Sequence, residues 1–211
     1  NDRLLLGLKG TMSEAELHVM KQRLVEAMRA KAKRGEFRFR VPPGFEWDEE
    51  GRLQKIADDQ VRSAIALIFS RFERLGTIHQ AQGSLAEDGV VVPVRSGRRH
   101  KVRWAPPHYE HLRRVLTNPM YAGAYCYGRR QVEEILDAAH QPVKRTRVRP
   151  RQDWPVLIRD HHDAYIPWER FEKIQRQIAL NRRAPPSPGA PREGRSLLQG
   201  LILCGRCGRR M

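Results

Sequence analysis

The fold is organised around the stretch Val61-Arg62-Ser63-Ala64-Ile65-Ala66-Leu67-Ile68-Phe69-Ser70-Arg71-Phe72. Its apolar residues recur three and four positions apart, which predicts an amphipathic helix with one face in a core. Asp58 or Asp59 can cap its start. The apolar face consists of Val61, Ala64, Ile65, Ile68, Phe69 and Phe72.

Toward the C-terminus, a second helix is predicted directly after Leu75-Gly76. Thr77 can cap it, and its apolar side carries Ile78, Ala81 and Leu85. Two helices joined by a turn that contains glycine could form a helix-turn-helix.

The sequence C-terminal to these two helices predicts a mixture of short strands and helices. Strands are predicted at residues 90–94, 120–127 and 156–158. A third helix opens at Pro106-Pro107 and ends at Asn118-Pro119, and a fourth begins at Pro167. Residues 131–153 read as irregular, and the Pro- and Gly-rich residues 184–195 as an extended linker. The fold class expected is mixed α+β.

Toward the N-terminus, Ser13-Glu14-Ala15-Glu16 forms a capping box, which predicts a helix that begins at Ser13. Gly35 is a natural stop for it. Leu17, Met20 and Leu24 form a narrow apolar stripe along this helix. The stripe fits either pairing with a partner helix or packing on the helix's own domain.

Charge is the strongest compositional signal. The 211 residues include 40 Lys and Arg against 24 Asp and Glu, a formal net charge of +16. This excess indicates a polyanionic partner, either nucleic acid or an anionic membrane surface. No apolar run approaches the roughly 18 to 20 residues of a membrane span, and no secretory signal is recognisable. Three cysteines are too few for a disulfide framework and fit a reducing cytosol.

The basic residues cluster in segments that suit a phosphate backbone, although any single segment could be a solvated loop. The candidate DNA-binding residues are Lys31, Lys33, Arg34, Arg38, Arg95, Arg98, Arg99, Lys101, Arg103, Arg129, Arg130, Lys144, Arg145, Arg147, Arg149, Arg182, Arg183, Arg192 and Arg195.

Cys204-Gly205-Arg206-Cys207 is a C-x-x-C knuckle, and Cys204 and Cys207 can supply half of a tetrahedral zinc site. The other ligands are expected beyond Met211. Alternatives are ligands from His161 and His162, or a redox dithiol, which lacks its usual βαβ context. A packed structural role is favoured for His161-His162-Asp163, and a core thiol for Cys126.

Several blocks resemble one family, the large serine recombinases of the resolvase/invertase group (phage integrases and transposases). The most specific is Val115-Leu116-Thr117-Asn118-Pro119-Met120-Tyr121-Ala122-Gly123, which resembles "Ile-Leu-x-Asn-Pro-x-Tyr-x-Gly". Gly89-Val90-Val91-Val92-Pro93 resembles "Gly-Ile-x-Thr-Pro", and Pro43-Gly44-Phe45 resembles the Pro-Gly-Tyr of that family. The segment from His161 to Pro167 resembles "His-x-Ala-Ile-Ile-Ser", and residues 198–207 resemble the opening of a zinc ribbon.

The resemblance implies a tail of the catalytic domain at residues 1–12, a linker helix at 13–35, a recombinase domain at 36–183, a linker at 184–195 and the start of a zinc ribbon at 196–211. It also implies double-stranded DNA as partner, zinc as a structural metal, and dimers or tetramers in the full-length protein. The parent would be a cytoplasmic site-specific recombinase of a bacterium or phage that integrates or excises a mobile element.

This sequence departs from that family at the nucleophile. None of its serines lies in the Tyr-x-Arg-x-Ser setting of the catalytic serine, so the chain by itself is expected to bind DNA without cutting it. No membrane partner and no small-molecule substrate are expected. The alternatives are a basic RNA-binding protein without recombinase activity, and a self-contained nuclease, for which no carboxylate cluster is visible.

Overall fold

The computed structural model describes residues 2–95, 101–136, 141–181, 202, 204 and 205, with side chains from residue 14 onward. It divides into two compact units. One comprises residues 1–39 and 126–158, and the other comprises residues 40–125 and 159–211. Helices and short antiparallel strand pairs occur in the described part, which confirms the mixed α+β prediction. The predicted domain boundaries stay predictions.

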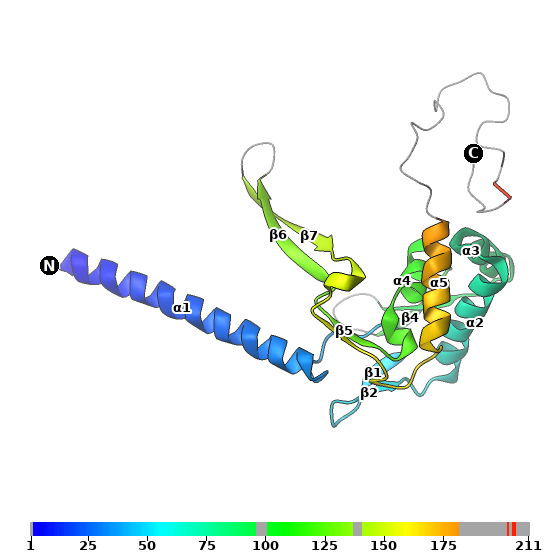
Figure 1. Ribbon diagram of the computed structural model, residues 1–211, viewed down its shortest axis with the longest axis horizontal. Coiled ribbons are helices and arrows are strands. Elements are labelled where there is room, and N and C mark those ends of the chain that lie inside the picture. Colours follow the sequence, from blue (N-terminus) through cyan, green and yellow to red (C-terminus); the bar gives the residue numbers. More distant parts are fainter. Residues whose placement is uncertain (1, 96–100, 137–140, 182–201, 203, 206–211) are drawn as a thin grey trace, which may run out of the picture. The chain divides into compact units, whose positions relative to one another are not determined.

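The second unit is built around helix α2 (Asp59–Leu75), which packs against α3 (Ile78–Glu87) and α4 (Tyr109–Leu116). Figure 1 shows these helices gathered beside α5 (Trp168–Leu180). The side chain of Asp58 accepts hydrogen bonds from two amides of the first turn of α2, so Asp58 rather than Asp59 is the cap. The predicted apolar face is confirmed, since five of its members are buried: Val61, Ile65, Ile68, Phe69 and Phe72.

The turn between α2 and α3 is as short as the sequence predicts. Gly76 ends α2 with φ +78°, and Thr77 accepts a hydrogen bond from the amide of Gln80 to cap α3. The C-terminal end of α5 contacts this turn, because the side chain of Asn181, the residue after α5, donates a hydrogen bond to the carbonyl of Gly76 at 2.7 Å. The two predicted helices are confirmed and pack against each other, whereas their reading as a helix-turn-helix stays a prediction.

Two small antiparallel sheets complete the second unit. Strand β1 (Phe45–Trp47) pairs with β2 (Leu53–Lys55), and β3 (Val92–Arg95) pairs with β4 (Val102–Ala105). Strand β3 confirms the short strand predicted there. Strand β4 was not predicted, because a run of four residues, none of them buried, gives only a weak strand signal.

The prediction of a strand over residues 120–127 is wrong for its first half. Residues Pro119–Ala122 form a 3₁₀ turn, η1, and only Tyr125–Tyr127 is a strand, β5. The Asn118 side chain accepts from the amide of Met120, and Pro119 occupies the first helical position. Asn118-Pro119 therefore ends one helix and at the same time starts the next turn.

An aromatic cluster around Tyr121 forms the core of this unit. The ring centroid of Phe45 lies 5.6 Å from that of Tyr121 and 5.3 Å from that of Tyr165. The ring centroids of Phe69 and Tyr121 are 5.7 Å apart. The backbone amides of Tyr165 and Ile166 both donate to the carbonyl of Tyr121. These contacts join β1, α2, η1 and the 161–166 segment, and they confirm Phe45 and Tyr121 as core residues.

In the first unit, a single helix α1 spans Asp2–Lys33, so the predicted start at Ser13 is wrong. The stretch before Ser13 is rich in leucine, a strong helix former, and a serine inside a helix costs under about 1 kcal/mol. The capping-box pattern therefore lies within a continuing helix. The predicted stop is confirmed, since α1 ends at Lys33 and Gly35 has φ +79°.

The described part of the first unit also contains strands, and here the prediction of irregular structure over 131–153 is wrong. Strand β6 (Arg130–Leu136) pairs with β7 (Pro142–Val148) in an antiparallel hairpin, and η2 (Arg151–Asp153) follows. Almost every residue of the hairpin is exposed, so its sequence lacks the apolar alternation that marks a half-buried strand. Strand β8 (Val156–Ile158), which pairs with β5, confirms its prediction.

Candidate nucleic-acid interface

The first predicted basic segment lies at the end of α1. Lys31 and Lys33 occupy the last turn of the helix, and Arg34 and Arg38 follow it; all four are exposed. Arg34 makes a bidentate pair with Glu36, at 2.9 and 2.8 Å. The cationic groups therefore accumulate at the helix C-terminus, where they also complement the helix dipole.

Arg95 has a structural role that its sequence setting did not indicate. Its side chain is half-buried, and Nη2 donates to the carbonyl of Phe45 at 2.6 Å. Arg40 in turn donates to the carbonyl of Arg95 at 3.1 Å. Burial lowers the pKa of Arg95 from its ordinary value. This guanidinium binds the backbone of β1, and a contact of Arg95 with DNA stays a prediction.

Exposed basic side chains also lie on β4, next to it, and on α4. Lys101 and Arg103 are exposed beside Trp104, whose residue exposure is 40%. The apolar face of α4 is buried and consists of Leu112, Val115 and Leu116. The opposite face carries the exposed Arg114 and also Arg113, which pairs with Glu110 at 3.6 Å. Arg113 and Arg114 were not predicted, because they do not belong to an acid-free basic run. Their signal in the sequence is their spacing opposite the apolar stripe of α4.

The third basic segment forms the β6–β7 hairpin, and its register determines which side chains share a face. Gln131 lies opposite Arg147, Glu133 opposite Arg145, and Ile135 opposite Val143. Arg130, opposite Val148, and Lys144, opposite Glu134, belong to the other face, because successive side chains alternate. The run of basic residues is thus divided between two surfaces.

Side-chain and backbone contacts hold the base of the hairpin. The guanidinium carbon of Arg129 lies 5.2 Å from the ring centroid of Trp154, and Trp154 Nε1 donates to the carbonyl of Arg149 at 3.0 Å. The amide of Arg149 donates to the carbonyl of Arg129, which extends the ladder by one pair. The buried Nε of Arg149 has no hydrogen-bond partner among the described residues.

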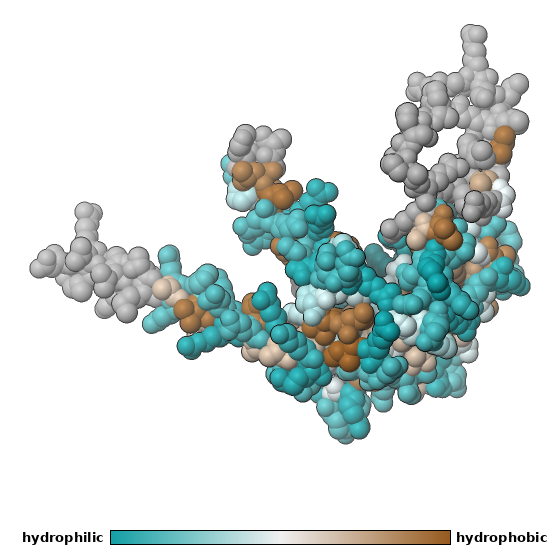
Figure 2. Space-filling view, in the orientation of Figure 1, coloured by the Kyte–Doolittle hydropathy of each residue, from teal (hydrophilic) through white to brown (hydrophobic). Residues whose placement is uncertain are grey.

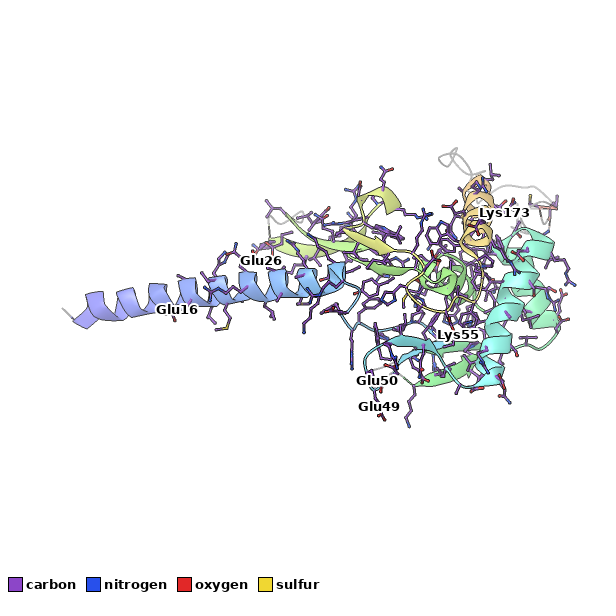
Figure 3. All side chains as sticks on the ribbon, turned by 60° about the horizontal axis from the view of Figure 1, so that its bottom comes forward. Glu16, Glu26, Glu49, Glu50, Lys55 and Lys173 are labelled. Carbon is purple, nitrogen blue, oxygen red and sulfur yellow. The ribbon has the colours of Figure 1, made fainter. Side chains whose placement is uncertain are left out.

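Acidic side chains are also exposed on the described surface. Figure 3 shows Glu49 and Glu50 projecting from the turn between β1 and β2, and Glu16 and Glu26 projecting from α1. Much of the described surface in Figure 2 is hydrophilic, with apolar side chains on part of the β6–β7 hairpin. The described surface therefore offers separate cationic areas that can meet a polyanion.

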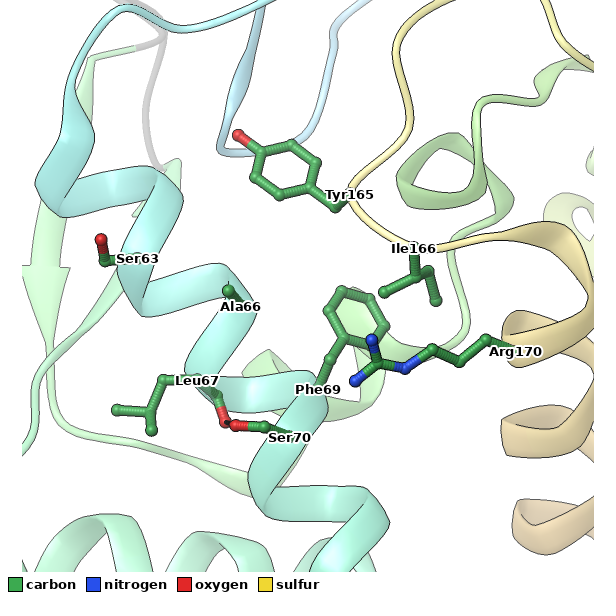
Figure 4. Close-up of a pocket in the computed structure, with 8 residues that line it drawn as sticks. All are labelled: Ser63, Ala66, Leu67, Phe69, Ser70, Tyr165, Ile166 and Arg170. Atoms are coloured by element: carbon green, nitrogen blue, oxygen red, sulfur yellow. Dashed lines mark hydrogen bonds between the residues drawn. The ribbon is translucent and has the colours of Figure 1, made fainter.

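One shallow pocket of about 450 Å³ lies beside α2, and Figure 4 shows the side chains around it. Ser70 donates its hydroxyl to the carbonyl of Leu67 at 3.0 Å, and Arg170 pairs with Glu73. The described residues that line this pocket include no His, Asp, Glu or Cys. Its lining residues are Ser63, Ala66, Leu67, Phe69, Ser70, Tyr165, Ile166 and Arg170.

The histidine pair has the packed, structural role that was favoured. His162 Nε2 lies 2.8 Å from the carbonyl of Met120, and its ring meets that of Phe45 edge-on at 5.0 Å. Burial is the main cause that lowers the pKa of His162, to about 4. Cys126 is buried, as predicted, and burial raises the pKa of its thiol.

The zinc prediction remains untested. Cys204 is half-buried, whereas Cys207 lies outside the described residues. Within residues 2–95, 101–136, 141–181 and the few described beyond them, no three side chains gather that could hold a metal ion. Arg98, Arg99, Arg182, Arg183, Arg192 and Arg195 also lie outside the described residues, as does the predicted linker.

The described helices include none that is both long enough and apolar enough to cross a bilayer. Leu17, Met20 and Leu24 of α1 are 52%, 66% and 61% exposed, and their pairing with a partner helix stays a prediction.

Comparison with known proteins identifies several similar chains. A curated protein of Sinorhizobium fredii (strain NBRC 101917 / NGR234), y4bA/y4pH, is 41% identical over 219 residues; the match covers 100% of this chain and 31% of that protein. This chain thus spans about a third of the length of that relative.

Two solved structures are also similar in part. One, described as a crystal structure of an LSR–DNA complex, has a TM-score of 0.47 and 18% identity, and the match covers 75% of this chain and 38% of that one. The other, from work on the sequence requirements of the Listeria innocua prophage attP site, has a TM-score of 0.40 and 22% identity, with 79% of this chain and 52% of that one covered.

The family model described as Recombinase matches residues 59–181, which is more than half of the 211 residues. The matched region begins at α2, includes the block around Tyr121 and ends just after α5. The chain belongs to the Recombinase family.

Proposed function

We propose that this chain is the DNA-binding portion of a site-specific serine recombinase and that it recognises attachment-site DNA. The observation that carries the proposal is the family match to residues 59–181, joined to exposed cationic surfaces on β4, α4 and the β6–β7 hairpin. Strand cleavage and rejoining through a serine nucleophile belong to the whole protein in this proposal.

The first experiment selects binders from a pool of random duplex DNA at two salt concentrations and sequences the retained molecules. A single long motif that survives the higher salt is the expected result, because base contacts persist when phosphate contacts are screened. Retention only at low salt, with no motif, would contradict sequence recognition.

Competition with single-stranded RNA distinguishes the alternative of an RNA-binding protein. RNA modules commonly stack bases on exposed aromatic rings, whereas Phe45, Phe69, Tyr121 and Tyr125 are buried here. We therefore expect duplex DNA to compete more strongly than RNA. A metal-dependent nicking assay with the same chain is expected to give no product.

Two further parts of the proposal concern assembly. Cys204 and Cys207 would supply two thiolates to a structural zinc ion whose remaining ligands come from elsewhere in the protein. Metal analysis of the full-length protein, compared with its Cys204→Ser variant, tests this assignment.

The exposed stripe Leu17, Met20 and Leu24 would pair α1 with a second copy in a dimer or tetramer. Loss of self-association in Leu24→Lys is the expected outcome.

A further inference from the structure

The two faces of the β6–β7 hairpin differ in chemistry, although the sequence places their basic residues in one run. We define the Arg face by Gln131, Glu133, Ile135, Val143, Arg145 and Arg147. The Val face is defined by Arg130, Val132, Glu134, Leu136, Pro142, Lys144, Thr146 and Val148. Both definitions follow from the antiparallel register and the alternation of side chains.

Positive charge accumulates along the Arg face. Arg145 and Arg147 are exposed, and the ladder continues through the opposed pair Arg129 and Arg149 at the base of the hairpin. Arg145 and Arg147 lie in β7, and Arg149 directly follows its last residue. Residues at every second position of an extended strand have Cα atoms about 7 Å apart. Unlike the exposed Arg145 and Arg147, Arg129 and Arg149 are half-buried. The one acid among the residues that define this face is Glu133.

The Val face is more apolar, and one of its two cations is paired with an acid. Val132, Leu136 and Val148 are 61%, 65% and 63% exposed. Lys144 pairs with Glu134, directly across the ladder, at 3.7 Å. Arg130 is the one cation of this face left without an acid opposite it in the register.

A two-stranded hairpin exposed on both faces gains little from burial and is marginal in water. A B-DNA major groove, roughly 12 Å wide, admits a two-stranded ribbon. A row of guanidinium groups on one side of such a ribbon matches the phosphates that border a groove. Charge complementarity therefore selects duplex DNA as the occupant of the Arg face.

We propose that the β6–β7 hairpin binds duplex DNA through its Arg face alone, and that the Val face points away from the DNA. This inference rests on the proposed function and adds to it which face of the hairpin contacts the DNA. The sequence treats Arg130 and Lys144 as equivalent to Arg145 and Arg147, whereas the register separates them.

The test compares two double variants of the same hairpin. Arg145→Gln with Arg147→Gln removes two positive charges from the Arg face, and Arg130→Gln with Lys144→Gln removes two from the Val face. Both variants change the net charge equally, so a general loss of electrostatic attraction affects them alike. Circular dichroism and thermal unfolding of each variant verify that the fold is retained.

We expect the Arg-face variant to bind duplex DNA at least about tenfold more weakly. The slope of log affinity against log salt should fall by about 1.8, which is 0.9 for each lost phosphate contact. The Val-face variant should change affinity less than about threefold and alter the slope by less than about one unit. Equal losses, or a larger loss from the Val face, overturn the inference.

A labelling experiment supplies an independent readout. Gln131→Cys places a thiol on the Arg face and Thr146→Cys places one on the Val face, and alkylation is read peptide by peptide so that the native cysteines do not interfere. DNA should slow the alkylation of Cys at position 131 and leave that at position 146 unchanged. Equal rates at both positions contradict the inference. Failure of the unmodified chain to bind duplex DNA at all refutes the proposed function instead.

Discussion

The hydroxyl of Tyr121 donates a hydrogen bond to the backbone carbonyl of Pro43, at 2.8 Å and across 78 residues of sequence. Tyr121 is fully buried, and burial raises the pKa of its phenol well above the ordinary value, so the hydroxyl remains a neutral donor. This bond fastens the segment that enters β1 to η1, the turn that follows α4. It gives the tyrosine of the Asn-Pro-x-Tyr block a structural role.

Tyr121→Phe should therefore destabilise the chain by about 1–3 kcal/mol, because the carbonyl of Pro43 loses its buried partner. Urea unfolding measures the effect. Tyr165→Phe is the matched control, since its hydroxyl also donates to a carbonyl, that of Gly44 at 2.8 Å, but the residue is only half-buried. A loss at Tyr165 equal to that at Tyr121 would contradict the explanation by burial.

Gly44→Ala should destabilise the chain by about 2–4 kcal/mol, the sum of a left-handed backbone and overpacking. Gly44 has φ +90°, and an added Cβ would lie 2.3 Å from Cδ1 of Ile65 and 2.7 Å from the hydroxyl of Tyr165. Gly83→Ala, inside α3 with nothing within 4 Å of its Cβ position, should instead stabilise by about 0.5–1 kcal/mol. Thermal unfolding of both variants checks the opposite signs.

His162 should make the free energy of unfolding depend on pH between about 4 and 6.5. Burial lowers the pKa of His162 in the folded chain to about 4, from an ordinary value of 6.5. Between these values the unfolded state binds a proton that the folded state does not, so stability is lost as the pH falls through this window.

The measurement is the denaturation midpoint at several pH values, for the wild type and for His162→Gln. Glutamine can still donate to the carbonyl of Met120 but cannot titrate. The wild type should therefore lose stability relative to His162→Gln as the pH falls from 6.5 toward 4. Parallel profiles would refute the assignment.

Asp58→Ala should cost about 1 kcal/mol of stability, because Asp58 accepts hydrogen bonds from two amides at the start of α2. The neighbouring Asp59→Ala removes a surface ion pair with Arg62 and should cost under about 0.5 kcal/mol. Chemical unfolding of the two variants separates the cap from the adjacent acid. A larger loss at Asp59 would contradict the assignment of the cap.

The sequence correctly predicted helices, a helix cap and a core position where one face of the helix or strand is buried. Helices α2 and α3, the cap of Thr77 and the core position of Cys126 all follow from apolar spacing and turn chemistry. These predictions succeeded because burial against a core imposes a period on the sequence.

Elements exposed on both sides were not readable in this way. The β6–β7 hairpin looked irregular because neither of its faces is covered, and the half-buried Arg95 looked like one more basic surface residue. Which cations share a face, and which guanidinium binds a carbonyl inside the unit, depends on strand register and on contacts distant in sequence. The spacing of apolar residues in a sequence shows which face of a helix or strand is buried. Strand register and hydrogen bonds between residues distant in sequence arise only when the chain folds.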